Sequence, residues 1–189
     1  MAKADLNAEN LEALEKGLPN LMQHVENITK VYGLPCVVAI NRFPMDTEAE
    51  LKLIEDKCHE VGVNVALSEV WAKGGEGGEE LAKEVIRLCE TESEFHYCYE
   101  TDTTIEEKLD AIVKKIYHGD GVTFTANAEK QIKTLTELGY DHMPICMAKT
   151  QYSFTDDQTK LGAPRDFTIT VRNVKVSAGA GFLVALTGE

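Results

Sequence analysis

Residues 36–44 read Cys-Val-Val-Ala-Ile-Asn-Arg-Phe-Pro, a continuous apolar run that ends in a polar turn. A run without polar alternation is typical of a strand that is covered on both faces, as in a parallel sheet. A second run, Val-Asn-Val-Ala-Leu-Ser, occupies residues 63–68. Between the runs, Thr47 and Glu50 have the spacing of a helix capping box, and Gly62 suits a helix end. The sequence therefore predicts a strand, a helix and a second, parallel strand.

Helices are predicted on both sides of this pair of strands. Upstream, Gly17 and Pro19 predict a break between two successive helices. Downstream, a loop at residues 69–78 leads into a further amphipathic helix. The predicted buried faces are Leu51, Ile54, Cys58 and Val61 in the helix between the strands, and Leu81, Val85 and Leu88 in the downstream helix.

The pattern changes from about residue 91. Residues 105–116 predict a helix, 122–125 a short strand, and the following helix carries apolar Ile132, Leu135 and Leu138 and ends at Gly139. We expect a buried strand at 144–148, a half-exposed strand at 167–171 and an apolar segment at 179–186. The chain stops at Glu189, soon after that segment, and is predicted to be cut there. The predicted fold is α/β, with parallel-sheet strand–helix units in residues 1–95 and a smaller α+β region in residues 96–189.

Composition excludes several functional classes. The 189 residues carry a formal charge of −13, which disfavours binding to nucleic acid and to anionic membrane surfaces. The chain has no long apolar run, and Met1–Asp5 lacks a signal-peptide core. Five cysteines without a Cys-x-x-Cys pair fit neither a zinc site nor a disulfide framework. We therefore predict a cytoplasmic chain without a metal site, and its histidines and cysteines form no recognisable catalytic set.

The candidate binding residues follow the two predicted strands. Ligands of open α/β sheets bind at the carboxyl ends of parallel strands, where both turns meet. Asn41 can present its amide to the edge of a heterocycle, while Phe43 and Trp71 can stack on a planar ring. The alternatives are structural, because Asn41 can bond turn amides, Phe43 can belong to the core, and Trp71 can cover the end of the sheet.

The segment Lys-Gly-Gly-Glu-Gly-Gly at residues 73–78 is a second candidate. Because it precedes a helix, free amides at Gly74 and Gly75 could hold an anion. Alternatively, its glycines only make the loop mobile. The segment is not a Walker loop, since Gly-x-x-x-x-Gly-Lys-Ser/Thr occurs nowhere in the chain.

Four segments together resemble the formate–tetrahydrofolate ligase family. They are Val37–Pro44 with Asp46–Glu50, Ala66–Gly78, Ala148–Asp157 and Ser177–Phe182. The resemblance extends from about residue 2 to the last residue. It implies part of an enzyme that makes 10-formyltetrahydrofolate from formate, ATP and tetrahydrofolate through formyl phosphate, with magnesium and stimulation by a monovalent cation.

The resemblance also assigns roles to particular residues. It implies that Phe43 and Trp71 sandwich the folate or adenine ring and that Pro44 and Leu67 line the pocket. The fold it implies is a P-loop NTPase-like part without its P-loop, because the family's phosphate-binding N-terminal part and its C-terminal tail are absent from this chain. We therefore expect no ligation by these 189 residues alone.

Two other functions stay open on the sequence. The chain could be a non-catalytic interaction or assembly module, or a small purine-nucleotide-binding protein built on the same strand ends. Formation of a homo-oligomer is also open. Fluorescence of Trp71, the single tryptophan, distinguishes these functions when folate and nucleotide are titrated separately.

Overall fold

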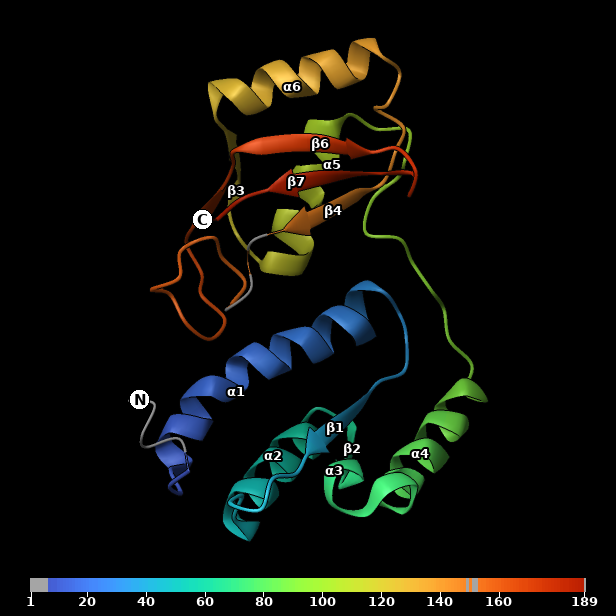
Figure 1. Cartoon of the computed structure of the whole chain (residues 1–189), viewed down its shortest axis with the longest axis vertical. Coiled ribbons are helices and arrows are strands. Elements are labelled where there is room, and N and C mark those ends of the chain that lie inside the picture. The colour runs from blue at the N-terminus through green and yellow to red at the C-terminus, as the bar shows by residue number, and fades with distance from the viewer. Residues whose placement is uncertain (1–6, 149, 151–152, 189) are drawn as a thin grey trace. The chain divides into compact units, whose positions relative to one another are not determined.

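The computed structural model describes residues 7–148, 150 and 153–188 (Figure 1). Lys149, Gln151 and Tyr152, in one of the family-like segments, lie outside the described residues, as do Met1–Asp5. The chain forms two compact units, Met1–Phe95 and His96–Glu189. Among the described residues, no helix has the length and apolar character needed to cross a membrane.

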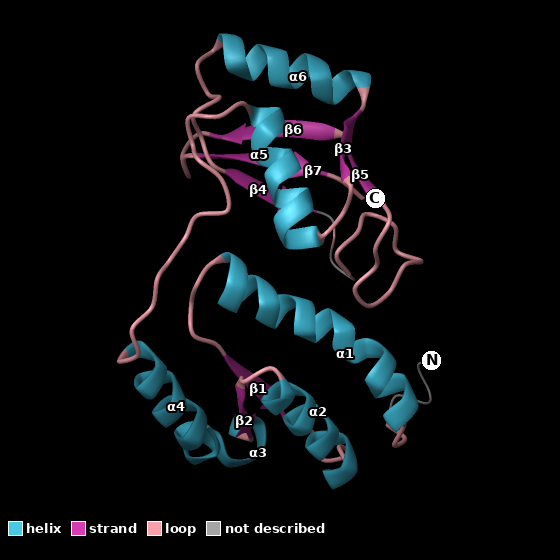
Figure 2. Cartoon of the chain, turned by 180° about the vertical axis from the view of Figure 1, so that it is seen from behind, coloured by secondary structure: helices cyan, strands magenta, loops and turns pink. Residues whose placement is uncertain are grey.

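The first unit is a two-stranded parallel sheet with helices. Strands β1 and β2 pair in parallel, with Val37 opposite Asn64 and Asn41 opposite Ser68, and helix α2 connects them (Figure 2). This confirms the predicted strand–helix–strand unit. The elements are α1 (Leu11–Glu26), the π-helix η2 (Asn27–Val31), β1 (Val37–Asn41), α2 (Glu48–Glu60), β2 (Asn64–Ser68), α3 (Val70–Lys73), the 3₁₀-helix η3 (Gly74–Gly78) and α4 (Glu79–Cys89).

Helix α2 begins as its sequence predicts. The Thr47 hydroxyl accepts the N–H of Glu50 at 3.3 Å, and the Glu50 carboxylate accepts the N–H of Thr47 at 3.2 Å. The other Glu50 oxygen accepts the N–H of Asn10 at 3.1 Å. These hydrogen bonds satisfy donors that helix starts leave free and hold the pKa of Glu50 below its usual value.

The predicted break between two N-terminal helices is wrong. Helix α1 runs from Leu11 to Glu26 through both Gly17 and Pro19. Within this helix, the side chains of Leu18 and Val25 are buried. Leu18 lies four residues after Leu14 and seven before Val25, so one apolar stripe crosses the Gly-Leu-Pro. Burial of that stripe outweighs the helix-breaking tendency of glycine and proline.

Burial in the first unit is less than the sequence predicts. In β1, Val38 is buried but Ala39 is exposed, so the strand is not covered on both faces. Leu51 and Cys58 of α2 are buried as expected, whereas Val61, at the helix end, is exposed. Helix α4 packs against β2 but contains no buried residue, contrary to its predicted inward face. A sheet of two strands is too narrow to cover these apolar faces.

The second unit has two small sheets. Strands β3 and β5 pair in parallel, and β7 lies between the parallel strand β4 and the antiparallel strand β6. This unit comprises His96–Glu189. Its elements are α5 (Ile105–Ile112), the π-helix η4 (Val113–Tyr117), β3 (Gly121–Phe124), α6 (Ala126–Glu137), β4 (Ile145–Ala148), β5 (Thr168–Val171), β6 (Asn173–Ser177) and β7 (Phe182–Leu186).

The core of the second unit joins its helices to both sheets. Its fully buried side chains include Leu109 of α5, Val171 of β5 and Leu183 of β7. Two predictions fail here. Strand β4 lies at a sheet edge with Cys146 exposed, and Leu138 follows the end of α6 and is exposed. The chain as a whole is α/β, with small parallel sheets and helices.

Candidate ligand-binding site

The two segments that follow β1 and β2 start side by side. Asn41 ends β1 opposite Ser68, which ends β2. The N–H of Arg42 donates to the carbonyl of Ser68 at 3.0 Å, which extends the strand pairing by one residue. Because the strands are parallel, both segments leave from the carboxyl edge of the sheet, as the sequence predicts.

A tight turn follows β1 and exposes Phe43. The Phe43 N–H donates to Oδ2 of Asp46 at 2.7 Å, and the Asp46 N–H donates back to the Phe43 carbonyl at 3.1 Å. The Asp46 carboxylate therefore closes this turn, directly before the Thr47 cap of α2. Phe43 is 53% exposed, and Pro44 and Met45 beside it are exposed as well. The phenylalanine is therefore not a core residue.

Trp71 lies on a short helix rather than in the predicted loop. It belongs to α3, the single turn that starts after Glu69, and it is 71% exposed. The N–H groups of Ala72 and Lys73 both donate to the Glu69 carbonyl. An indole this exposed neither fills the core nor covers the end of the sheet, so both structural alternatives for the aromatic pair are disfavoured.

The carboxyl edge therefore carries more exposed apolar surface than the sequence indicated. Phe43 and Trp71 emerge there, Leu67 is exposed near the end of β2, and Asn41 is exposed at the end of β1. Sequence reasoning missed Met45 and Val70, which are also exposed at this edge. The only feature of the sequence that could have identified them is their position close to the two aromatic residues. Exposed apolar side chains on two segments that leave the same sheet edge favour a binding surface there.

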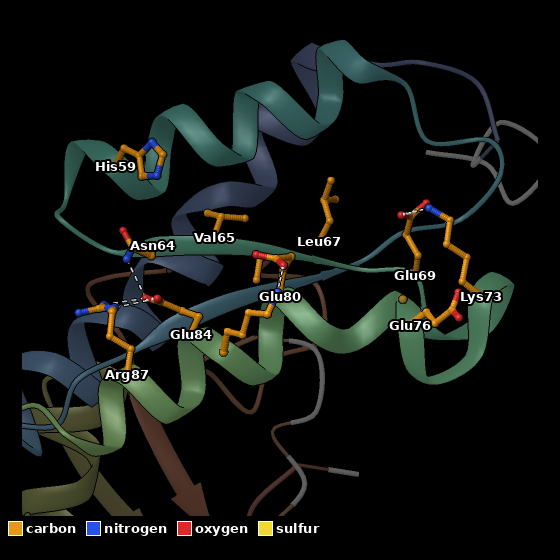
Figure 3. Close-up of a pocket in the computed structure, with 13 residues that line it drawn as sticks. His59, Asn64, Val65, Leu67, Glu69, Lys73, Glu76, Glu80, Glu84 and Arg87 are labelled. Carbon is orange, nitrogen blue, oxygen red and sulfur yellow. Dashed lines mark hydrogen bonds and ion pairs between the residues drawn. The ribbon is translucent and has the colours of Figure 1, made fainter.

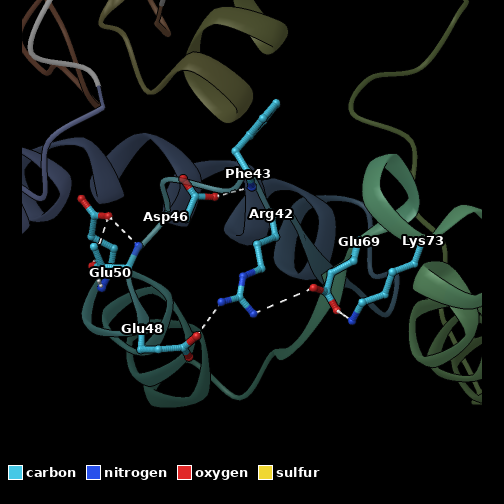
Figure 4. A network of polar contacts seen from close by, with 8 residues as sticks. Arg42, Phe43, Asp46, Glu48, Glu50, Glu69 and Lys73 are labelled. Atoms are coloured by element: carbon cyan, nitrogen blue, oxygen red, sulfur yellow. Dashed lines mark hydrogen bonds and ion pairs between the residues drawn. The ribbon is translucent and has the colours of Figure 1, made fainter.

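A chain of charged side chains connects the two segments (Figure 4). Arg42 contacts Glu48 with Nη2 at 2.5 Å from Oε1, and its Nη1 lies 4.0 Å from Oε1 of Glu69. The other Glu69 oxygen accepts a hydrogen bond from Nζ of Lys73 at 2.6 Å. The hydrogen bond from Lys73, aided by the charges of Lys73 and Arg42, holds the pKa of Glu69 below its usual value. Sequence reasoning singled out neither Arg42 nor Glu69 for this role.

The glycine-rich segment is a 3₁₀-helix and not the predicted free loop. The N–H of Gly74 donates to the carbonyl of Val70, so that amide is already used. Gly75 is exposed, with open space around it. Glu76, Glu79 and Glu80 bring carboxylates to the same region, which opposes a phosphate group there. An anion site at Gly74 and Gly75 stays a prediction that the local charge disfavours.

A cavity of about 650 Å³ lies along β2, α3 and α4 (Figure 3). Within it, Glu84 accepts hydrogen bonds from Asn64 at 2.7 Å and from Arg87 at 2.7 and 2.8 Å. These bonds lower the pKa of Glu84 to about 2. Leu67 lines the cavity, but Phe43 and Trp71 do not. Its lining is strongly charged, so the cavity is better suited to form the rim of a site than to bind a planar aromatic ligand.

The described residues offer no donor set for the cations that the resemblance implies. In residues 7–148, 150 and 153–188, no three side chains of His, Cys, Asp or Glu come together as metal ligands. Asp120, Asp156, Asp157 and Asp166 line a hollow in the second unit, but Asp156 and Asp157 already accept backbone N–H groups. We therefore assign no residue of this chain to magnesium or to a monovalent cation.

The family model described as formate–tetrahydrofolate ligase matches residues 1–189, the full length of the chain. The match includes both strand ends, the turn that carries Phe43 and the helix that carries Trp71. The chain belongs to the formate–tetrahydrofolate ligase family.

Proposed function

We propose that this chain carries the ring-binding part of an ATP-dependent ligase that joins formate to tetrahydrofolate and gives 10-formyltetrahydrofolate. One observation carries the proposal. Two largely exposed aromatic side chains, Phe43 and Trp71, follow paired parallel strands at the edge where ligands of such sheets bind. Membership of the family supports a folate as the ligand, and the resemblance implies that the adenine of a nucleotide is the other ring that this pocket takes.

The residues at this edge suit a flat heterocycle. Phe43 and Trp71 offer ring faces, and stacking on an aromatic side chain contributes about 1–3 kcal/mol per ring. Pro44 and Leu67 add apolar contacts, and the exposed amide of Asn41 supplies a donor and an acceptor to the ring edge. In this proposal the aromatic pair provides affinity and Asn41 provides orientation.

The same proposal limits what these residues do alone. Formation of formyl phosphate requires transfer of the γ-phosphoryl group of ATP, which depends on a phosphate-binding loop and a metal ion. The sequence contains no Walker motif, and carboxylates surround the glycine-rich segment. We therefore expect the 189-residue chain to bind substrate rings without ligating formate. Five free thiols agree with a reducing compartment such as the cytoplasm.

Fluorescence of Trp71 tests the proposal. Tetrahydrofolate and ADP are titrated separately into the 189-residue chain, and saturable quenching by tetrahydrofolate is the expected result. Quenching by ADP alone supports the purine-nucleotide-binding function instead, and quenching by neither removes the proposal. A parallel assay with formate, ATP and tetrahydrofolate is expected to show no turnover, and measurable turnover contradicts the inactivity of the isolated chain.

One observation favours an assembly function as the second candidate. Helix α4 buries none of its residues, and its side chain Ile86 is 60% exposed beside Val85. Apolar residues left exposed along one helix favour packing against another polypeptide. Sedimentation of the wild-type chain and of Ile86→Glu tests this. Concentration-dependent association that the substitution abolishes supports assembly through α4, and a monomeric wild-type chain argues against it.

A further inference from the structure

Arg42 is the side chain that connects the two aromatic segments. We propose that the Arg42–Glu69 ion pair is a positioning device that fixes the helix carrying Trp71 relative to the turn carrying Phe43. The effect of this ion pair on ligand affinity rests on the proposed function, because the ion pair influences affinity only if the two rings bind one ligand. Neither residue is assigned contact with the ligand.

Arg42 is held in place through both its backbone and its side chain. Its backbone N–H is bonded to Ser68 at the end of β2, and its guanidinium contacts Glu48 in the first turn of α2. Arg42 directly precedes Phe43 in the chain. The planar fork of the guanidinium allows one nitrogen to face Glu48 while another faces Glu69, which a lysine ammonium does less well.

The Glu69 end is fixed to the helix that carries Trp71. Its carboxylate holds Lys73, its carbonyl accepts two N–H groups of α3, and its own N–H donates to the Gly77 carbonyl at 2.9 Å. A Cβ atom at Gly77 would lie 2.4 Å from the carbonyl carbon and oxygen of Glu69, so only glycine permits this approach. Movement of Glu69 is therefore coupled to movement of α3 and its Trp71.

The pair is partly shielded from water. The side chains of Arg42 and Glu69 are 30% and 28% exposed, whereas many other ion pairs of this unit join largely exposed side chains. Partial burial reduces screening by salt, so the contact holds its geometry better than a surface pair. An arrangement of the two segments that is fixed before the ligand arrives reduces the ordering cost of binding.

A double-mutant cycle tests this device with the full 189-residue chain. Arg42→Gln, Glu69→Gln and the double variant are compared by Trp71 fluorescence anisotropy without ligand and by calorimetric titration of tetrahydrofolate. Lys52→Gln, which removes a 3.0 Å ion pair to Asp56 within α2, is the matched control. Circular dichroism verifies the fold, and Arg42→Lys serves as a milder variant.

Arg42→Gln is expected to lower the Trp71 anisotropy and to weaken tetrahydrofolate binding about two- to fivefold, the range of partly exposed ion pairs. The double variant is expected to resemble the single variants, because partners in one contact are not additive, and Lys52→Gln is expected to resemble wild type. Arg42→Lys is expected to recover part of the anisotropy.

The two readouts separate this device from the proposed function. Unchanged anisotropy in Arg42→Gln, or additive effects in the double variant, overturns the positioning device even if tetrahydrofolate binds. Lowered anisotropy in a chain that binds no tetrahydrofolate supports the device and removes the proposed function. A loss of anisotropy in Lys52→Gln equal to that in Arg42→Gln also overturns it, because the effect is then not specific to the connection between the segments.

Discussion

The two units of the chain are built on different balances of apolar and charged contacts. In the second unit, α5 packs fully buried Ile105 and Leu109 against residues of both sheets. In the first unit, one core cluster is formed by Val25, Val38, Cys58 and Val63, and helix α4 contains no fully buried residue. Apolar burial is the main source of folding free energy, so most of the stability is expected in the second unit.

The first unit uses charged contacts where the second uses apolar ones. Glu84 connects β2 to α4 through Asn64 and Arg87, and Arg42 connects the segments after β1 and β2. Phe43 and Trp71 of this unit lie on the surface and contribute little to its core. The comparison indicates that the first unit leaves more large apolar side chains exposed than the second, among them Phe43 and Trp71 of the proposed binding site.

A core substitution gives the largest expected effect and tests this difference. Leu109→Ala is expected to lower the free energy of unfolding by about 2–5 kcal/mol, because it leaves a cavity in the second unit. Val85→Ala in the exposed face of α4 is expected to cost less than about 0.5 kcal/mol. Urea unfolding measures the change in the free energy of unfolding, and hydrogen exchange shows in which unit the change occurs. Equal costs for the two substitutions contradict the proposed imbalance.

A smaller effect is expected from acid, and it is confined to the first unit. The pKa of Glu84 is about 2 in the folded chain against an ordinary value of 4.5, so its ionised form stabilises the fold above pH 4.5. That contribution is lost as the pH falls from 4.5 toward about 2. Glu84→Gln is therefore expected to be less stable than wild type at neutral pH, with the difference disappearing in acid.

Glu80→Gln is the control for this acid effect, since Glu80 contacts Lys83 within α4 and does not reach β2 through Asn64. Urea midpoints across the pH range are the measurement. A difference between wild type and Glu84→Gln that is as large at a pH of about 2 as at neutral pH shows that the charge of Glu84 is not what stabilises the connection between α4 and β2.

The features that the sequence predicts correctly are those with a strong local signal. The capping box at Thr47 and Glu50 marks the start of α2, and the apolar runs mark β1 and β2, whose connection by one helix makes them parallel. The position of Phe43 and Trp71 at one edge follows from that topology. These signals depend on a few neighbouring residues, so they can be recognised in a single amino-acid sequence.

The predictions that fail depend on contacts distant in the sequence. Gly17 and Pro19 are locally typical of a helix break, but Leu18 between them is buried and α1 continues. Amphipathic α4 has the pattern of a buried face, yet it packs against a sheet of only two strands, has no fully buried residue and leaves Val85 exposed. The Arg42–Glu69 contact joins residues 27 positions apart, and nothing in their sequence spacing specifies it.

The central claim is that Phe43 and Trp71 act on one planar ligand, and the most direct measurement is calorimetric titration of tetrahydrofolate into wild type, Phe43→Ala and Trp71→Ala. Loss of either ring is expected to weaken binding by about 1–3 kcal/mol, the value of one aromatic stacking contact. Val85→Ala, at an exposed apolar position outside the two segments, is expected to bind as wild type does. Unchanged affinity in both aromatic variants would contradict the claim.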